Sequence, residues 1–308
     1  MIAIPDKTKQ FLFLFIKLFI VVGAFYFCYN QLANNEKLDW NKFLVLLQKN
    51  QSFWGITFIL SLSFLNRFLE ILKWQNLVQT IQKISLANAT KQVLVALTLG
   101  IFTPVGVGEY AGKALFFEKK WTKNIIFLNL ICNGIQIVVT LFFGTIGIII
   151  LGYWKWALAL VGIALLLFLV FFLSKNIKIK GFSLLTFIQK INEIPRKIHQ
   201  KNIFLGSCRY LVFSHQYYFL FLAFDVNLPY LTSLATIATV YFLASSLPTF
   251  QFLDFAVKGS IAVYFFGLLG VNEWIVVFVS TLMWFLNIVL PVIIGSYFVL
   301  NYKLSKAE

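Results

Sequence analysis

Long uninterrupted apolar stretches dominate the pattern of hydrophobic and polar positions along this chain. A helix needs about 20 apolar residues to cross the hydrocarbon core of a bilayer. Six stretches meet that requirement: 11–29, 52–72, 124–150, 154–173, 203–224 and 275–300. Because these runs are continuous and do not alternate with polar residues, they predict membrane-spanning α-helices rather than barrel strands.

Two further apolar stretches, 92–117 and 230–270, are interrupted by Pro104 and Pro248. Proline lacks a backbone donor and breaks a helix. Each stretch is therefore expected either to enter the membrane and return, or to form two paired crossings. The sequence predicts an all-α, polytopic membrane helix bundle, a single domain over 1–308, with about six full spans plus these two broken segments.

Composition agrees with a membrane protein and excludes a soluble one. The 308 residues are 60% hydrophobic and 12% charged, with a mean hydropathy of +0.85, whereas about 25% of an ordinary soluble domain is charged. Three scattered cysteines and two distant histidines indicate neither a disulfide framework nor a metal centre. No cofactor is expected. The first apolar run has no small-residue cleavage site, so we expect a retained span rather than a signal peptide.

The formal charge of +15 is explained mostly by topology. If the N-terminus is inside and 92–117 returns to the side it entered from, 17 of the 26 Lys and Arg residues lie inside and four outside. A full crossing by 92–117 would place the basic loop 174–202 outside, against the positive-inside rule. We therefore expect a re-entrant 92–117 and both termini in the cytoplasm. The loop is either an amphipathic helix on the inner leaflet or a solvated linker.

Two hexapeptides share the pattern acid, aromatic, alanine, any residue, lysine, small residue. They are EYAGKA, which starts at Glu109, and DFAVKG, which starts at Asp254. Each follows one of the interrupting prolines, and the spans around the two have opposite directions. The sequence thus predicts an inverted repeat, 52–150 against 203–300, an architecture that many secondary transporters use.

Each hexapeptide places an acid four residues before a lysine, on one helical face. The pairs are Glu109 with Lys113 and Asp254 with Lys258. A charge inside the membrane costs at least about 2.5–3.5 kcal/mol, so such pairs often mark a polar pathway. The alternatives are a structural ion pair within the bundle, or lysines that extend to the membrane surface.

Two further groups are candidates for binding. Arg67, Glu70 and Lys73 share a face near the inner end of the second span, although Lys73 and Trp74 also fit ordinary interfacial anchoring. Glycines before Glu109 leave backbone N–H groups accessible to an anion, or simply allow a tight re-entrant turn. The candidate substrate-binding residues are Arg67, Glu70, Lys73, Pro104, Gly108, Glu109, Lys113, Pro248, Asp254 and Lys258.

These motifs resemble those of the lysylphosphatidylglycerol synthase transmembrane (flippase-like) family. The resemblance rests on Asn66, Glu70, Lys73-Trp74, Phe102-Thr103-Pro104, Gly108-Glu109-Tyr110 and Lys113, and the Pro248 to Gly270 stretch resembles the family's second broken motif. The departures are Lys113, where arginine is usual, and Thr249 to Asp254, which replaces a glycine-rich, glutamate-bearing motif. We expect no aminoacyl-transferase domain of the kind that the full-length synthases carry, so the resemblance implies a stand-alone lipid-translocation module.

Three functions follow as hypotheses. The first is a flippase-like protein of the bacterial inner membrane that moves an anionic phospholipid or a polyprenyl-phosphate-linked amphiphile. The second is a non-catalytic accessory protein that holds an enzyme of a lipid or cell-envelope glycan pathway through the loop 174–202. The third is a lipid-modifying enzyme, which we do not expect because no hydrolytic motif is present. Nucleic acid is not an expected partner.

Overall fold

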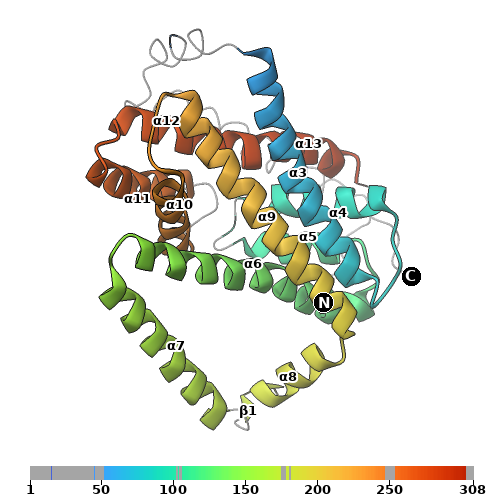
Figure 1. Ribbon diagram of the computed structural model, residues 1–308. Helices are drawn as coiled ribbons and strands as arrows, with labels where there is room; N and C mark the ends of the chain where they lie inside the picture. Colours follow the sequence, from blue (N-terminus) through green and yellow to red (C-terminus); the bar gives the residue numbers. More distant parts are fainter. Residues whose placement is uncertain are drawn as a thin grey trace.

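The computed structural model describes residues 52–101, 103, 106–174, 178–179, 182–246 and 254–302, together with Phe15 and Val45 (Figure 1). Apart from Phe15, the expected first span 11–29 lies outside these residues, as do Pro104 and Pro248. The described part is an all-α helix bundle, which confirms the predicted fold class. Its strands, β1 (Lys178–Ile179) and β2 (Phe182–Ser183), form only a two-residue antiparallel ladder.

Four long helical segments form the frame of the bundle. They are α3 (Phe53–Val78), α6 (Thr122–Ile150), α9 (Arg196–Ala223) and a continuous run of α12 (Glu273–Trp284), the π-helix η2 (Phe285–Val289) and α13 (Leu290–Leu300). Among the described residues, three segments are long and apolar enough to cross a membrane: Phe53–Val78, Lys119–Ile150 and Glu273–Leu300. The last two include the whole of the predicted spans 124–150 and 275–300, and the first includes all but one residue of the predicted span 52–72.

The two interrupted stretches are each a pair of shorter helices, as the prolines predict. The first pair is α4 (Leu86–Gly100) and α5 (Val107–Ala114), and the second is α10 (Tyr230–Ser245) and α11 (Asp254–Leu268). In each pair the two helices pack against each other. Both hexapeptides lie at or near the start of the second helix of their pair. At 1.5 Å per residue, the eight residues of α5 extend about 12 Å, well short of the roughly 30 Å hydrocarbon core.

Helices of the first half, α3 to α6, pack against helices of the second half, α9 to α13, in a reciprocal pattern. Helix α3 lies along α9, α4 packs on α13, and α6 packs on α10 (Figure 1). If α3, α4 and α6 correspond to α9, α10 and α12–α13, exchanging the halves leaves the α3–α9 contact in place and converts the other two contacts into each other. This is the packing that a two-fold repeat produces, and the inverted direction of the repeat stays a prediction.

Glycine allows close approach at the two corresponding helix crossings. A Cβ on Gly295 of α13 would lie 2.3 Å from Thr98 Oγ1 and 2.5 Å from the Leu94 carbonyl oxygen of α4. A Cβ on Gly147 of α6 would lie 2.5 Å from the Ala235 carbonyl oxygen of α10. Small residues that let backbones touch are the usual means of helix association in membranes. The same device therefore joins the halves at both crossings.

The buried apolar side chains form two main clusters, one in each half. The first-half cluster joins α3, α4 and α6 around Trp74, Val93 and Leu128. The second-half cluster joins α9 to α12 around Phe221 and Phe266. Neither cluster fills the space between the halves, and the polar residues described below lie there.

The structure corrects the expected bounds around the basic loop. Helix α9 begins at Arg196, earlier than the predicted span 203–224, and α8 (Leu184–Asn192) occupies much of the predicted loop 174–202. The ring of Phe187 packs on Phe127 at 5.5 Å, and Ile194 is buried against the first-half cluster. The interpretation of this segment as a solvated linker is therefore wrong for residues 184–194. Whether α8 lies on the inner leaflet stays a prediction.

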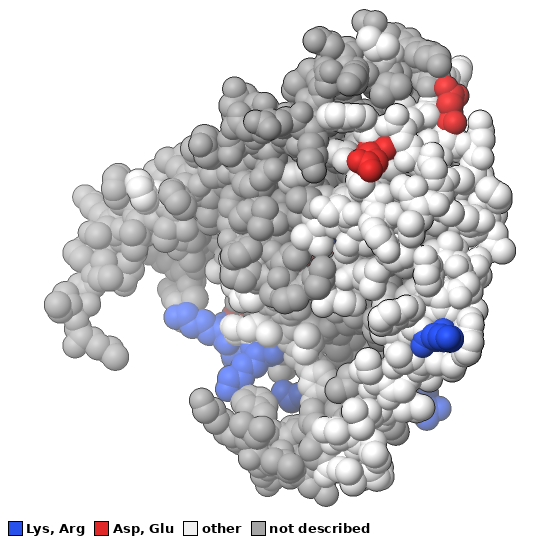
Figure 2. Space-filling model, turned by 90° about the vertical axis from the view of Figure 1, so that its left-hand side faces the viewer, with Lys and Arg blue, Asp and Glu red and all other residues white. Residues whose placement is uncertain are grey.

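The remaining elements connect these helices. The 3-10 turn η1 (Lys119–Trp121) precedes α6, and α7 (Trp154–Ser174) follows it with the predicted bounds 154–173. Apolar side chains cover α7, and most of those described are exposed on the surface of the bundle. On the face shown in Figure 2, the most prominent acidic side chains lie toward the upper part and the basic ones toward the lower part.

Candidate functional site

Each of the four long helical segments carries a polar residue at or beside its midpoint. These residues are Arg67 in α3, Gln136 in α6, Arg209 in α9 and Asn287 in η2. A helix of 26 residues or more is longer than the hydrocarbon core is thick. Polar side chains at four helix midpoints form a polar centre between the halves.

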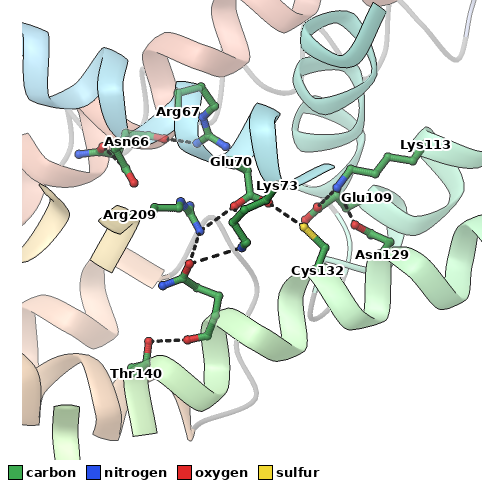
Figure 3. A network of polar contacts seen from close by, with 12 residues as sticks. Asn66, Arg67, Glu70, Lys73, Glu109, Lys113, Asn129, Cys132, Thr140 and Arg209 are labelled. Carbon is green, nitrogen blue, oxygen red and sulfur yellow. Dashed lines mark hydrogen bonds and ion pairs between the residues drawn. The ribbon is translucent and has the colours of Figure 1, made fainter. Parts of the chain in front are cut away.

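Glu70 is the hub of one side of this centre (Figure 3). Its Oε2 atom lies 2.9 Å from Arg209 Nη1 and 3.3 Å from Lys73 Nζ. Both cations also approach the Gln136 side-chain oxygen, Arg209 at 3.3 Å and Lys73 at 3.5 Å. The thiol of Cys132 lies 3.6 Å from the second Glu70 oxygen. A carboxylate with this many donors is held rigidly, and its charge is more than balanced.

Lys113 belongs to a second, enclosed group of contacts. Its Nζ atom lies 3.0 Å from Glu109 Oε1, donates to Asn129 Oδ1 at 2.6 Å, and sits 4.6 Å from the centre of the Trp74 ring. The indole N–H of Trp74 in turn donates to Gln92 at 2.7 Å. The Lys113 side chain is 0% exposed. The group joins α3, α4, α5 and α6, and Lys113 has the geometry of a structural ion pair.

On the opposite side, the π-turn at Asn287 organises a set of amides. Arg67 Nη2 donates to the Asn287 carbonyl oxygen at 2.6 Å, and Asn66 donates to the Asn287 side-chain oxygen at 2.6 Å. The Asn287 side-chain nitrogen donates to Gln216 at 3.0 Å and to the Met283 carbonyl at 3.0 Å. π-turns occur frequently at functional sites. Here the turn connects α3, α9 and the last long segment.

A cavity of about 410 Å³ opens between these groups. Residues of both halves line it, from α3, α4, α5 and α6 on one side and from α9, α10, α11, α12 and η2 on the other. Its charged lining residues among those described are Arg67, Glu70, Glu109, Arg209 and Lys258, and apolar side chains such as Leu97, Phe213 and Ile288 form much of the rest. A cavity with cations beside apolar walls can hold a molecule that has an anionic end and an apolar body.

The structure brings together some of the predicted site residues. Arg67, Glu70, Glu109 and Lys258 line the cavity. Lys73 does not line it but pairs with Glu70, which does. Lys113 does not line it. Lys258 also lies 4.9 Å from the centre of the Tyr241 ring. These positions leave the substrate-binding roles as predictions.

Other predicted site residues lie outside the cavity or outside the described part. The amide of Gly108 donates to Thr103 Oγ1 at 2.7 Å, and a Cβ there would lie 2.2 Å from the Leu99 carbonyl oxygen. This glycine therefore folds α5 back on α4 and offers no free N–H to a phosphate. Pro104, Pro248 and the side chain of Asp254 lie outside the described part of the structure, although α11 begins at Asp254.

Two interpretations of single residues are corrected. Lys73 and Trp74 are each 0% exposed, inside α3 and not at its end, so they do not anchor the helix at a membrane surface. The ladder predicted for Arg67, Glu70 and Lys73 forms only in part. Glu70 pairs with Lys73, whereas the Arg67 guanidinium turns to the Asn287 carbonyl.

Attention to charges alone missed the amides of the centre. Each of Asn129, Gln136, Gln216 and Asn287 contacts a charged residue or another amide of the centre. The signal was present in the sequence, because a polar side chain within a membrane segment is costly unless it has a partner.

Apolar helices around a buried, charged cavity define a multi-pass membrane protein. A family model described as the lysylphosphatidylglycerol synthase TM region matches residues 14–250. The chain belongs to this family, as its motifs had suggested. Neither a curated protein nor a solved structure matches the chain.

Proposed function

We propose that this protein is a flippase-like transporter that moves an anionic amphiphile across the bacterial inner membrane. The amphiphile is a phospholipid or a polyprenyl-phosphate-linked molecule. The observation that carries the proposal is the cavity between the halves, in which three cations, Arg67, Arg209 and Lys258, face two acids and a largely apolar wall. A lipid headgroup needs such a polar centre to pass the hydrocarbon core, and membership of the family supports this role.

The shape of the broken helices supports the same function. Helices α5 and α11, of 8 and 15 residues, are too short to cross about 30 Å of hydrocarbon at 1.5 Å per residue. We therefore propose that each pair enters the membrane and turns back, and that the pairs meet at the cavity. Discontinuous helices around a central site are the common plan of secondary transporters with inverted repeats. Both termini lie in the cytoplasm in this proposal, and the protein needs neither catalysis nor a cofactor.

The test is a dithionite-quench assay of fluorescent phosphatidylglycerol in proteoliposomes. Wild-type protein is expected to increase the fraction of inner-leaflet lipid that becomes accessible. Glu109→Gln, which removes a carboxylate at the cavity, is expected to slow this movement roughly tenfold. The matched control is Glu118→Gln, because the Glu118 side chain is 70% exposed just beyond α5 and pairs with the exposed Lys120. Rates no higher than those of protein-free liposomes would contradict the proposal.

An accessory role for the basic segment makes the opposite prediction. Under the transport proposal, replacing Lys190, Arg196 and Lys197 with glutamine leaves lipid movement in proteoliposomes unchanged. If these residues hold an enzyme at the membrane, the triple variant instead loses function in cells while Glu109→Gln retains it. Lipid mass spectrometry of a deletion strain separates both from an enzyme, which would change a lipid chemically and not only its location.

A further inference from the structure

Arg67 and Arg209 occupy corresponding places in the two halves. Each lies at or beside the midpoint of its helix, and α3 and α9 pack along each other at the centre of the bundle. Each arginine also reaches across to the other half. Arg67 of the first half binds the Asn287 carbonyl in the second, and Arg209 of the second half binds Glu70 and Gln136 in the first.

The two guanidinium groups have donors that the protein does not use. A guanidinium carries five N–H donors. Arg67 donates through Nη2 and Arg209 through Nη1, and in both residues the buried Nε atom has no hydrogen-bond partner. A buried donor without a partner costs about 1–3 kcal/mol. A bound group that accepts hydrogen bonds from both arginines would give a partner to these unused donors and remove their desolvation cost.

Both arginines line the same cavity. The carboxylate beside Arg209 is already shared with Lys73, so the centre retains excess positive charge. Planar guanidinium groups bind phosphate through two parallel hydrogen bonds, which an ammonium group does not provide. The apolar wall of the cavity suits the chains attached to such a phosphate.

We infer that Arg67 and Arg209 together bind the phosphate group of the transported lipid, one from each half, and that Lys113 is a structural partner outside this site. This inference rests on the proposed function. The phosphate site then consists of the arginines at the midpoints of α3 and α9, and not of the lysines of the two hexapeptides. The phosphate can belong to a phospholipid or to a polyprenyl phosphate, since both present the same acceptor atoms.

Binding to purified protein in neutral detergent tests this separately from transport. The probes are dioctanoyl phosphatidylglycerol, farnesyl phosphate, and dioctanoylglycerol as the phosphate-free control. Arg67→Gln and Arg209→Gln are each expected to weaken binding of a phosphate-bearing probe roughly tenfold or more, because charge-assisted hydrogen bonds are lost. The probe that wild type binds more tightly identifies the source of the phosphate. The control variant is Arg196→Gln, which removes the same charge from the exposed start of α9 and is expected to bind as wild type does.

Arg67→Lys and Arg209→Lys keep the charge, and Arg209→Lys keeps a cation beside Glu70. They remain usable if a glutamine variant does not fold, and their binding is expected to fall between wild type and glutamine. Wild-type affinity in a folded variant of either arginine overturns the inference. An equal loss of dioctanoylglycerol binding also overturns it, because it would indicate a collapsed cavity. A wild-type protein that binds neither phosphate lipid overturns it as well. Normal phosphate binding without lipid movement would instead refute the proposed function and leave the inference standing.

Discussion

The two halves of the molecule carry nearly the same hexapeptide but use its lysine differently. In the first half Lys113 is fully buried and held by Glu109, Asn129 and the Trp74 ring. In the second half Lys258 is partly exposed, lines the cavity and lies over Tyr241. The local pattern is shared, but the neighbours that decide burial come from other helices. A sequence repeat therefore predicts a common helix position and not a common role.

The largest expected difference between the halves is in stability. Lys113→Met leaves Glu109 and Asn129 without a donor in a buried site, so we expect a loss of about 3–5 kcal/mol in the free energy of unfolding. Lys258→Met removes a partly exposed cation, for which we expect about 1 kcal/mol or less. Thermal unfolding in detergent measures both.

A double variant sharpens this comparison. Lys113→Met with Glu109→Gln removes both charges together, and it is expected to recover much of the stability that the single change loses. Equal destabilisation by Lys113→Met and Lys258→Met would show that the two lysines are equivalent after all.

The second comparison concerns the glycine contacts between the halves. Gly295→Ala places a Cβ within 2.5 Å of both Thr98 Oγ1 and a backbone oxygen, and Gly147→Ala places one 2.5 Å from a backbone oxygen. Overpacking of this kind costs about 1–3 kcal/mol, and we expect Gly295→Ala near the upper end. Gly134→Ala is the control, because a Cβ there meets nothing within 4 Å on the same helix α6. A loss of stability in the control and not at the crossings would contradict the packing described.

The amides are expected to contribute less to stability than the glycine contacts. Asn287→Leu leaves the side-chain nitrogen of Asn66 without its acceptor and the side-chain oxygen of Gln216 without its donor, for a loss of about 1–2 kcal/mol in the free energy of unfolding. Gln136→Leu is expected to cost less, because Lys73 and Arg209 both retain Glu70. Chemical unfolding of the two variants side by side measures the difference. A larger loss at Gln136 would show that the first half, not the second, depends on its amide.

The fold was largely predictable, whereas the site was predictable only in part. Apolar runs fixed the helices because membrane helices must satisfy their backbone internally, and prolines marked the breaks between α4 and α5 and between α10 and α11. The partners of a buried charge are a property of packing between distant helices. Arg209 and Asn287 meet Glu70 and Arg67 across more than a hundred residues of chain, and no local pattern contains that information.

The π-turn at Phe285–Val289 has a consequence for the far end of its helix. A π-turn holds one residue more than an α-turn, so the helix beyond it is rotated by about 100° relative to an uninterrupted α-helix. Gly295 lies beyond the turn and faces Thr98 only in that rotated register. The insertion that presents a carbonyl to Arg67 thus also sets which face of α13 meets α4. Removing one residue from the turn would rotate Gly295 away from Thr98. The proposed phosphate site and the packing of α13 on α4 therefore both depend on the extra residue of the π-turn.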